Sequence, residues 1–259
     1  MRDTPPDAPT VRADDARLRL AVTGTDTGVG KTVVSCALLS ALRARGCEVG
    51  GMKPVETGVV ARHAGTDAER IRRAAGGVHR AEDVCPFTFP DPLSPHVAAR
   101  RAGRSVDVPV LDRAFARVER AADAVVVEGA GGLLVPLAPA LALADLAARW
   151  RLALVVVAAN RLGVINHLLL TVREAERRGL AVRGVVLNAC RRDAGGLASA
   201  TNAEAVRELL PGVPLAPFPW LGARVEHADT LTAAGEALLD ALAIDASPTR
   251  PVTGGRPAW

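Results

Sequence analysis

One short stretch constrains the fold more than any other part of this 259-residue chain. Residues 23–32, TGTDTGVGKT, follow the apolar run 18–22 and open the helical pattern of residues 33–45. A strand, a glycine-rich turn and Gly-Lys-Thr at a helix start are the order that a phosphate-binding loop requires. In such a loop, backbone N–H groups and the positive end of the helix point at an anion. The stretch therefore predicts a nucleoside triphosphate site.

The spacing of the glycines departs from the usual form of this loop, GxxxxGK[ST]. Counting back from Gly30 places Thr25 where the first glycine usually lies, and the nearer glycine, Gly24, comes one residue early. The alternative is a glycine-rich turn with a solvated lysine, but the order of strand, turn and helix favours the phosphate loop. In that loop Lys31 reaches the outer phosphates, and Thr32 offers a hydroxyl to Mg²⁺.

Two further predicted strands end in charged residues, at the carboxyl ends where an open α/β sheet places functional groups. Residues 47–53 predict a short strand that ends at Lys53 before Pro54, where a lysine is as readily solvated as catalytic. Residues 123–132, DAVVVEGAGG, predict a buried strand that ends at Glu128 and passes into a turn. An acid there holds the metal or its water in phosphate-loop proteins; the alternative is a plain strand-end acid.

Asp67 has two candidate roles. Residues 66–69, TDAE, have the form of a capping box at a helix start, with Asp67 in the first turn, where the helix dipole favours negative charge. Capping is a sufficient structural reason for an acid at this position. The alternative is a ligand of the metal that accompanies a nucleotide.

The rest of the chain alternates continuous apolar runs with helical patterns. Strands that do not alternate in polarity indicate a parallel sheet covered on both faces. We therefore predict an α/β protein with a single-domain P-loop NTPase fold, a mainly parallel β-sheet with helices on both faces. The further elements expected are strands over 152–158, 182–187 and 213–217, helices over 108–122, 164–178, 200–210 and 227–244, and loops over 85–95 and 218–226.

Composition narrows the class of protein. The net charge of +4 comes from scattered arginines and there is no tyrosine, which argues against a nucleic-acid surface. The four cysteines form no C-x-x-C pair, which argues against a zinc site or a disulfide framework. No apolar run approaches the ~20 residues of a membrane span, so we expect a cytoplasmic protein. Residues 1–17 and 245–259 are expected to be disordered extensions of a domain that spans 18–244.

Several of these motifs together resemble the dethiobiotin synthetase family. The resemblance runs from about Leu18 to Leu242, and the early glycine of the phosphate loop is itself typical of this family. Leu93 and Ala189 differ from the residues that are frequent there. The other motifs that carry the resemblance are KPV at 53–55 with TG at 57–58, SPH at 94–96, VEGAGG at 127–132, LGVINH at 162–167 and PWL at 219–221.

The resemblance implies an ATP- and Mg²⁺-dependent ring closure of 7,8-diaminononanoate with CO₂, giving dethiobiotin in the pathway to biotin. One amine takes up CO₂ as a carbamate, whose oxygen attacks the γ-phosphate of ATP to form a carbamic-phosphoric anhydride. The second amine then closes the ring with loss of phosphate. Because a carbamate and a triphosphate repel each other, the site must supply cations and oriented dipoles.

The resemblance also implies roles for individual residues. The catalytic residues are Lys31, at the phosphates, and Lys53, at the carbamate and the transferring phosphoryl group. Thr32, Asp67 and Glu128 form the Mg²⁺ set, and Thr57 contacts the substrate. Gly163 and Asn166 bind the substrate carboxylate from the other subunit of a homodimer. The ATP site comprises Gly28, Val29, Gly30, Lys31, Thr32, Val33, Asp67, Glu128, Gly129, Ala130, Gly131, Asn188 and Ala189, with Pro219, Trp220, Leu221 and Glu226 closing the base pocket.

The nearest alternative is a P-loop switch ATPase of the partitioning or division-positioning type. Those proteins carry a second lysine at the start of the phosphate loop, where this chain has Thr25 and Asp26. A second alternative, an amidotransferase-type ligase of corrinoids, needs a glutaminase domain, and the chain after Leu242 is expected to be too short for one. Neither alternative accounts for Lys53 and Thr57 in their motif.

Overall fold

A computed structural model describes residues 17–61, 63–120, 122–192 and 196–248. The expected N-terminal extension, residues 1–17, lies outside the described residues except for Arg17. The expected C-terminal tail lies outside them from residue 249 onward. Within the described residues, no helix is both long enough and apolar enough to cross a membrane.

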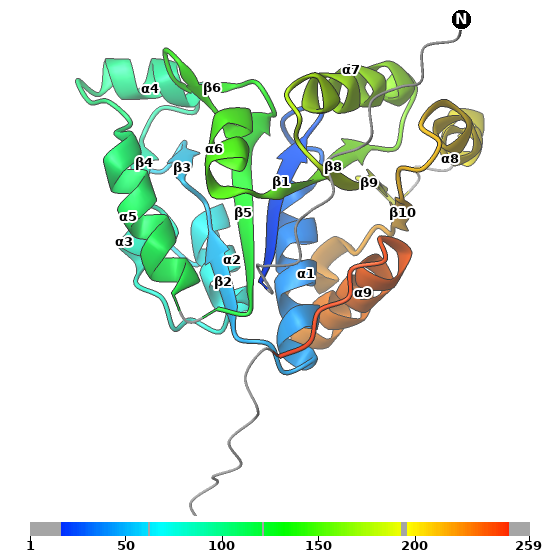
Figure 1. The fold of residues 1–259 in the computed structure, drawn as a ribbon, viewed down its shortest axis with the longest axis horizontal. Coiled ribbons are helices and arrows are strands. Elements are labelled where there is room, and N and C mark those ends of the chain that lie inside the picture. The colour runs from blue at the N-terminus through cyan, green and yellow to red at the C-terminus, as the bar shows by residue number, and fades with distance from the viewer. Residues whose placement is uncertain (1–16, 62, 121, 193–195, 249–259) are drawn as a thin grey trace, which may run out of the picture.

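Six strands form the central sheet, in the order β10-β9-β8-β1-β5-β2 (Figure 1). Every neighbouring pair in this sheet runs parallel, which confirms the predicted sheet type. β1 lies inside the sheet, and its residue Val22 pairs with Glu128 on one side and Val155 on the other. The strands are β1 (Leu18–Gly24), β2 (Val49–Met52), β5 (Ala124–Gly132), β8 (Ala153–Ala159), β9 (Val182–Asn188) and β10 (Leu215–Phe218).

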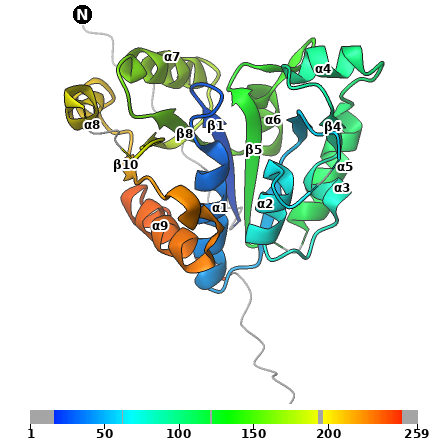
Figure 2. The same cartoon turned by 180° about the vertical axis from the view of Figure 1, so that it is seen from behind.

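Helices cover both faces of the sheet, as predicted (Figures 1 and 2). One face carries α1 (Lys31–Ala44), α2 (Asp67–Ala74) and α9 (Ala228–Ala241); the other carries α5 (Val108–Glu119), α6 (Leu143–Trp150), α7 (Val164–Arg177) and α8 (Leu197–Leu209). The shorter elements are β3 (Val55–Thr57), α3 (Ala81–Val84), β4 (Phe87–Phe89), α4 (Pro95–Arg101), β6 (Pro136–Ala138), β7 (Leu141–Ala142) and the 3₁₀ helix η1 (Gly222–Glu226).

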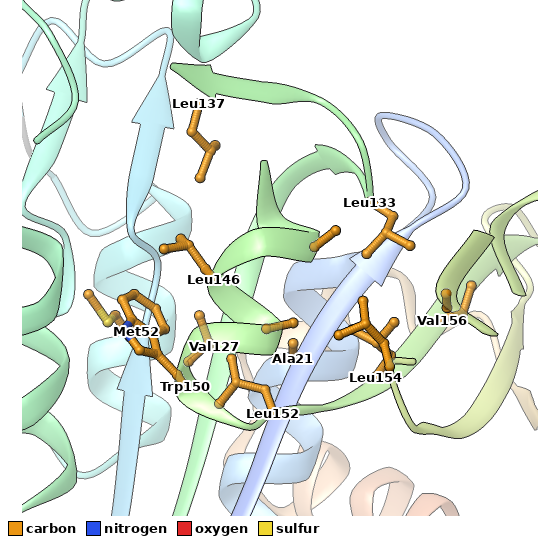
Figure 3. Packing of buried hydrophobic residues seen from close by; sticks show 14 of the residues in the cluster. Ala21, Met52, Val127, Leu133, Leu137, Leu146, Trp150, Leu152, Leu154 and Val156 are labelled. Carbon is orange, nitrogen blue, oxygen red and sulfur yellow. The ribbon is translucent and has the colours of Figure 1, made fainter. Parts of the chain in front are cut away.

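Two apolar layers hold these helices on the sheet. Val125 and Val127 of β5 face one layer, while Val126 faces the other, and all three are at most 1% exposed. This two-sided burial explains why the strand shows no polar alternation. In the first layer Trp150 stacks on Phe115 with ring centroids 4.4 Å apart, and Figure 3 shows Trp150 beside the aliphatic residues of this layer.

Three sequence expectations need correction. The predicted loop over 85–95 contains β4, which pairs with β3 because Phe87 and Phe89 bury their rings. The strand expected to end at Glu128 continues to Gly132, since β1 still pairs with it there. The 218–226 loop contains the 3₁₀ turn η1. No element was predicted over 133–151, where the structure has β6, β7 and α6.

Candidate active site

The phosphate loop joins β1 to α1 through two glycines in the left-handed conformation. Gly28 has φ 74° and Gly30, the residue before α1, has φ 95°. A Cβ on Gly30 would lie 2.0 Å from the side-chain nitrogen of Asn188, at the end of β9, so this position needs glycine for space as well. The same Asn188 amide donates to the carbonyl of Val29 at 2.8 Å. The far strand β9 thus helps to hold the loop in shape.

The start of α1 is suited to an anion. Its first turn contains no acidic residue and no side chain caps it, so its leading N–H groups and positive dipole end face the loop. Lys31 is 7% exposed, and its Nζ donates to the carbonyl of Asp26 across the loop at 3.0 Å. Burial, together with the nearby positive charge of Lys53, lowers the pKa of Lys31.

Lys53 lies directly after β2 and meets two carboxylates from other elements. Its Nζ donates to Oε1 of Glu128 at 2.5 Å and to Oδ2 of Asp67 at 3.0 Å. Burial by itself would lower the pKa of Lys53, but the two carboxylates outweigh it and raise the pKa above the ordinary value. Lys53 is therefore a fixed ammonium, suited to stabilising negative charge and unsuited to acting as a base.

Thr32 joins the same cluster from the first turn of α1. Its hydroxyl donates to Oε1 of Glu128 at 2.9 Å. Asp67 begins α2; burial opposes its charge, but Lys53 and Thr32 outweigh that effect and lower its pKa. The structure therefore brings together Lys53, Thr32, Asp67 and Glu128 from four separate segments.

The capping box expected at Thr66 is wrong. The Thr66 hydroxyl donates to the carbonyl of His63 at 2.9 Å and makes no bond to the helix start. Glu56 of β3 takes that role, because its carboxylate accepts the backbone N–H groups of Asp67 and Ala68. Glu56 is not among the site residues predicted from the sequence. Its only local signal was an acid inside a short apolar strand after Lys53, and its partners lie 11 and 12 residues further along the chain.

A cavity of about 860 Å³ opens beside the cluster. Lys31, Lys53 and Asp67 line its polar side, and Thr57 lies on its wall. The apolar part of this wall comes from segments far apart in the chain, and of its residues only Val33 and Ala130 were predicted for the site. It consists of Val33, Val55, Pro92, Leu93, Pro95, Ala130 and Val135.

A second, smaller cavity of about 170 Å³ lies on the other side of the loop, against β9 and β10. Its lining includes the loop glycines Gly28 and Gly30 and five residues predicted for the ATP site, Asn188, Ala189, Pro219, Trp220 and Leu221. The N–H of Ala189 donates to the carbonyl of Phe218 at 2.9 Å, which joins the two strand ends that form this wall. The side chain of Glu226 lies outside the described part of the chain.

Comparison with known proteins identifies the family. A family model described as "AAA domain" matches residues 19–232. The ATP-dependent dethiobiotin synthetase BioD of Anaeromyxobacter dehalogenans (strain 2CP-C) is 51% identical over 202 residues, which are 78% of this chain and 89% of that protein. This chain belongs to the dethiobiotin synthetase family. The predicted activity, an ATP-dependent ligase of biotin biosynthesis, is thereby confirmed.

Other relatives agree with this assignment. The dethiobiotin synthetase BioD 1 of Salmonella typhi is 37% identical to this synthetase over 215 residues, which are 82% of this chain and 93% of that protein. Among solved structures, a variant of McdA from Cyanothece in complex with ATP superposes with a TM-score of 0.50 at 17% identity. The match covers 90% of this chain and 98% of that one. At this identity the likeness supports the fold alone.

The donor set of this synthetase fits a magnesium ion. Oε2 of Glu128 is fully buried and has no hydrogen-bond partner in the described part of the chain. A buried carboxylate oxygen without a partner is costly, and a hard cation that prefers oxygen ligands would satisfy it. No group of three or more His, Cys, Asp and Glu that suits a metal is found among the described residues. A metal here would therefore depend on two carboxylates, the Thr32 hydroxyl and water.

Two predicted substrate contacts lie apart from the main cavity. Gly163 is the residue before α7, with φ 91°, and Asn166 is exposed in the first turn of that helix. Neither residue lines the 860 Å³ cavity of its own chain. Their assignment to a substrate carboxylate stays a prediction.

Proposed function

We propose that this synthetase closes the cyclic urea of dethiobiotin at the cavity beside Lys53, with the residue roles described below. The observation that carries the proposal is the Lys53 ammonium, which lies between Asp67 and Glu128 at the edge of a cavity that the phosphate loop also lines. A buried lysine at the edge of a cavity that the phosphate loop also lines is typical of a functional site.

The first task of the site is to bring two anions together. A carbamate must approach the γ-phosphate of ATP, and both groups carry negative charge. Lys31 and Lys53 are close enough for the charge of Lys53 to depress the pKa of Lys31. That mutual repulsion is relieved when an anion lies between them. The pair therefore favours the arrangement in which the carbamate oxygen and the phosphoryl group are both bound.

Thr32, Asp67 and Glu128 would hold Mg²⁺, whose contribution when bound is to offset charge on the phosphate oxygens. The unpartnered Glu128 oxygen supports this assignment. Lys53 keeps its proton throughout and acts by charge, on the carbamate first and on the transferring phosphoryl group second. The leaving phosphate carries away the carbamate oxygen when the second amine closes the ring.

The apolar wall of the cavity would receive the alkyl chain of the diamine, while Thr57 contacts its amine end. The carboxylate at the far end then needs an anchor, and we assign it to Gly163 and Asn166 of a second copy of the chain. The start of α7 has no acidic residue in its first turn, which suits an anion. Leu162, directly before Gly163, and Leu170, one turn after Asn166 on α7, are 87% and 63% exposed and offer apolar surface for a homodimer.

Phosphate release, followed by a coupled assay, tests the proposed reaction. The wild-type chain should release phosphate from ATP only when both the diamine and bicarbonate are present. The switch ATPase hypothesis predicts instead a basal release that the diamine does not change. Release that ignores both substrates would reject the proposed function, whatever its rate.

A further inference from the structure

One carboxylate outside the proposed catalytic set joins the two segments that carry Lys53 and Asp67. Glu56 lies on β3, shortly after Lys53 in the chain, and is 7% exposed. Its Oε1 accepts the backbone N–H of Asp67 at 2.7 Å, and its Oε2 accepts that of Ala68 at 3.2 Å. These N–H groups belong to the first turn of α2, where the helix itself offers them no acceptor.

Glu56 caps α2 from a different element. No side chain next to the helix start makes a capping bond, and the Thr66 hydroxyl points to His63 instead. A carboxylate at a helix N-terminus is also favoured by the helix dipole. Because the cap comes from β3, a shift of the first turn of α2 away from that strand would break both hydrogen bonds.

The strand that carries Glu56 is itself fixed. β3 pairs in parallel with β4, and Val55, directly before Glu56, is 1% exposed. On the other side of Glu56, Thr57 faces the substrate cavity. Glu56 thus links an anchored strand to the helix start on which Asp67 lies.

We propose that Glu56 is a positioning residue that sets the place of the Asp67 carboxylate relative to Lys53 and Glu128. The proposal rests on the roles of Asp67 and Lys53 in the proposed function. Two hydrogen bonds at the backbone of Asp67 and Ala68 fix the start of α2, so that Oδ2 of Asp67 lies 3.0 Å from Nζ of Lys53. Groups that orient a metal ligand in this way typically change metal affinity about 10- to 100-fold when they are removed.

The test compares Glu56→Ala and Glu56→Gln with Glu69→Gln. Glu69 lies with Asp67 in the first turn of α2, and its carboxylate pairs with Arg72. Its variant therefore removes the same charge and leaves the cap in place. Three quantities are measured: the Mg²⁺ concentration for half-maximal turnover, the affinity for ADP with and without Mg²⁺, and hydrogen exchange at the Asp67 and Ala68 amides.

We expect Glu56→Ala to raise the half-saturating Mg²⁺ concentration about tenfold or more. ADP affinity without Mg²⁺ should stay unchanged, and exchange at the two amides should accelerate. Glu56→Gln keeps one acceptor oxygen and should give a smaller change in the same direction, which keeps the test valid if the alanine variant does not fold. Glu69→Gln should behave as the wild type in its Mg²⁺ requirement.

Two results would overturn the proposal. Faster amide exchange in Glu56→Ala with an unchanged Mg²⁺ requirement would make Glu56 a helix cap and nothing more. If Glu69→Gln raised the half-saturating Mg²⁺ concentration by the same factor, the effect would come from the lost charge alone. The Asp67→Asn variant tests the metal site separately. If it needs no more Mg²⁺ than the wild type for half-maximal turnover, the proposed role of Asp67 is wrong. If Asp67→Asn raises the Mg²⁺ requirement and Glu56→Ala does not, only the proposed role of Glu56 is rejected.

Discussion

Lys31 and Lys53 are both buried lysines at one cavity, yet their surroundings indicate different roles. Lys31 donates within the phosphate loop, whereas Lys53 is held between two carboxylates. We therefore expect Lys53→Ala to lower kcat by about 10²- to 10³-fold, as for the loss of one oxyanion donor, with ATP affinity nearly unchanged. Lys31→Ala should weaken ATP binding as well. Steady-state kinetics together with calorimetry of nucleotide binding distinguish the effects of the two variants. Turnover of Lys53→Ala at the wild-type rate would contradict the role assigned to Lys53.

The two carboxylates next to Lys53 give a second prediction. Asp67→Asn and Glu128→Gln keep the side-chain shape and remove the charge, so each should raise the Mg²⁺ concentration needed for half-maximal turnover, roughly tenfold or more. A magnesium titration is read beside a melting curve for each variant. Lower thermal stability with an unchanged Mg²⁺ requirement would leave Asp67 and Glu128 as structural acids.

Among the secondary-structure elements, the contact between the phosphate loop and β9 gives the third prediction. Gly30→Ala would place an added Cβ at an unfavourable φ and in contact with the Asn188 amide. Gly28→Ala has only the unfavourable φ, since no atom lies within 4 Å of its added Cβ. Gly30→Ala should lower the free energy of unfolding by about 1 to 3 kcal/mol, and Gly28→Ala by less. Adding Asn188→Ala should recover part of the loss in the first variant only, as measured by urea unfolding.

How far the sequence predicts these elements depends on how local their causes are. β1 and β5 contain apolar runs at 20–22 and 124–127, β8 is apolar throughout and α1 follows a glycine turn, so each shows its own signal. β4 and the cap of α2 depend on partners elsewhere in the chain: Phe87 pairs with Val55, and Glu56 accepts the amide of Asp67. No local pattern contains that information.

The candidate site likewise has parts that the sequence predicts and parts that it does not. The loop motif and the strand-end positions of Lys53 and Glu128 are visible in the sequence, because parallel strands bring their carboxyl ends together. The choice between a cap and a ligand for Asp67 was not visible. The Thr66 hydroxyl donates to the carbonyl of His63 and does not cap the helix, while the role of Asp67 as a metal ligand stays a prediction. The apolar wall around Leu93 combines residues of β3, β5 and the start of α4, and the contact between these separate segments has no linear signature.

For the whole molecule, the proposed homodimer gives the fourth prediction. If the partner's α7 start anchors the substrate carboxylate, then Lys53→Ala and Gly163→Glu homodimers should each be nearly inactive. A mixed dimer contains one site with intact Lys53 and an intact partner Gly163. We expect mixing to restore up to about a quarter of the wild-type activity per subunit, if subunits exchange at random. No recovery despite demonstrated exchange would reject a shared site.

The origin of the oxygen that leaves with the phosphate is the most direct test of the proposed reaction. If a carbamate oxygen attacks the γ-phosphate and the second amine then displaces phosphate, that oxygen must end in the phosphate. With ¹⁸O-labelled bicarbonate, the diamine and ATP in ordinary water, over times shorter than label exchange, each released phosphate should contain one labelled oxygen by mass spectrometry. Unlabelled phosphate from a bicarbonate pool that has kept its label would show that water attacks ATP, and would contradict the proposed reaction at Lys53.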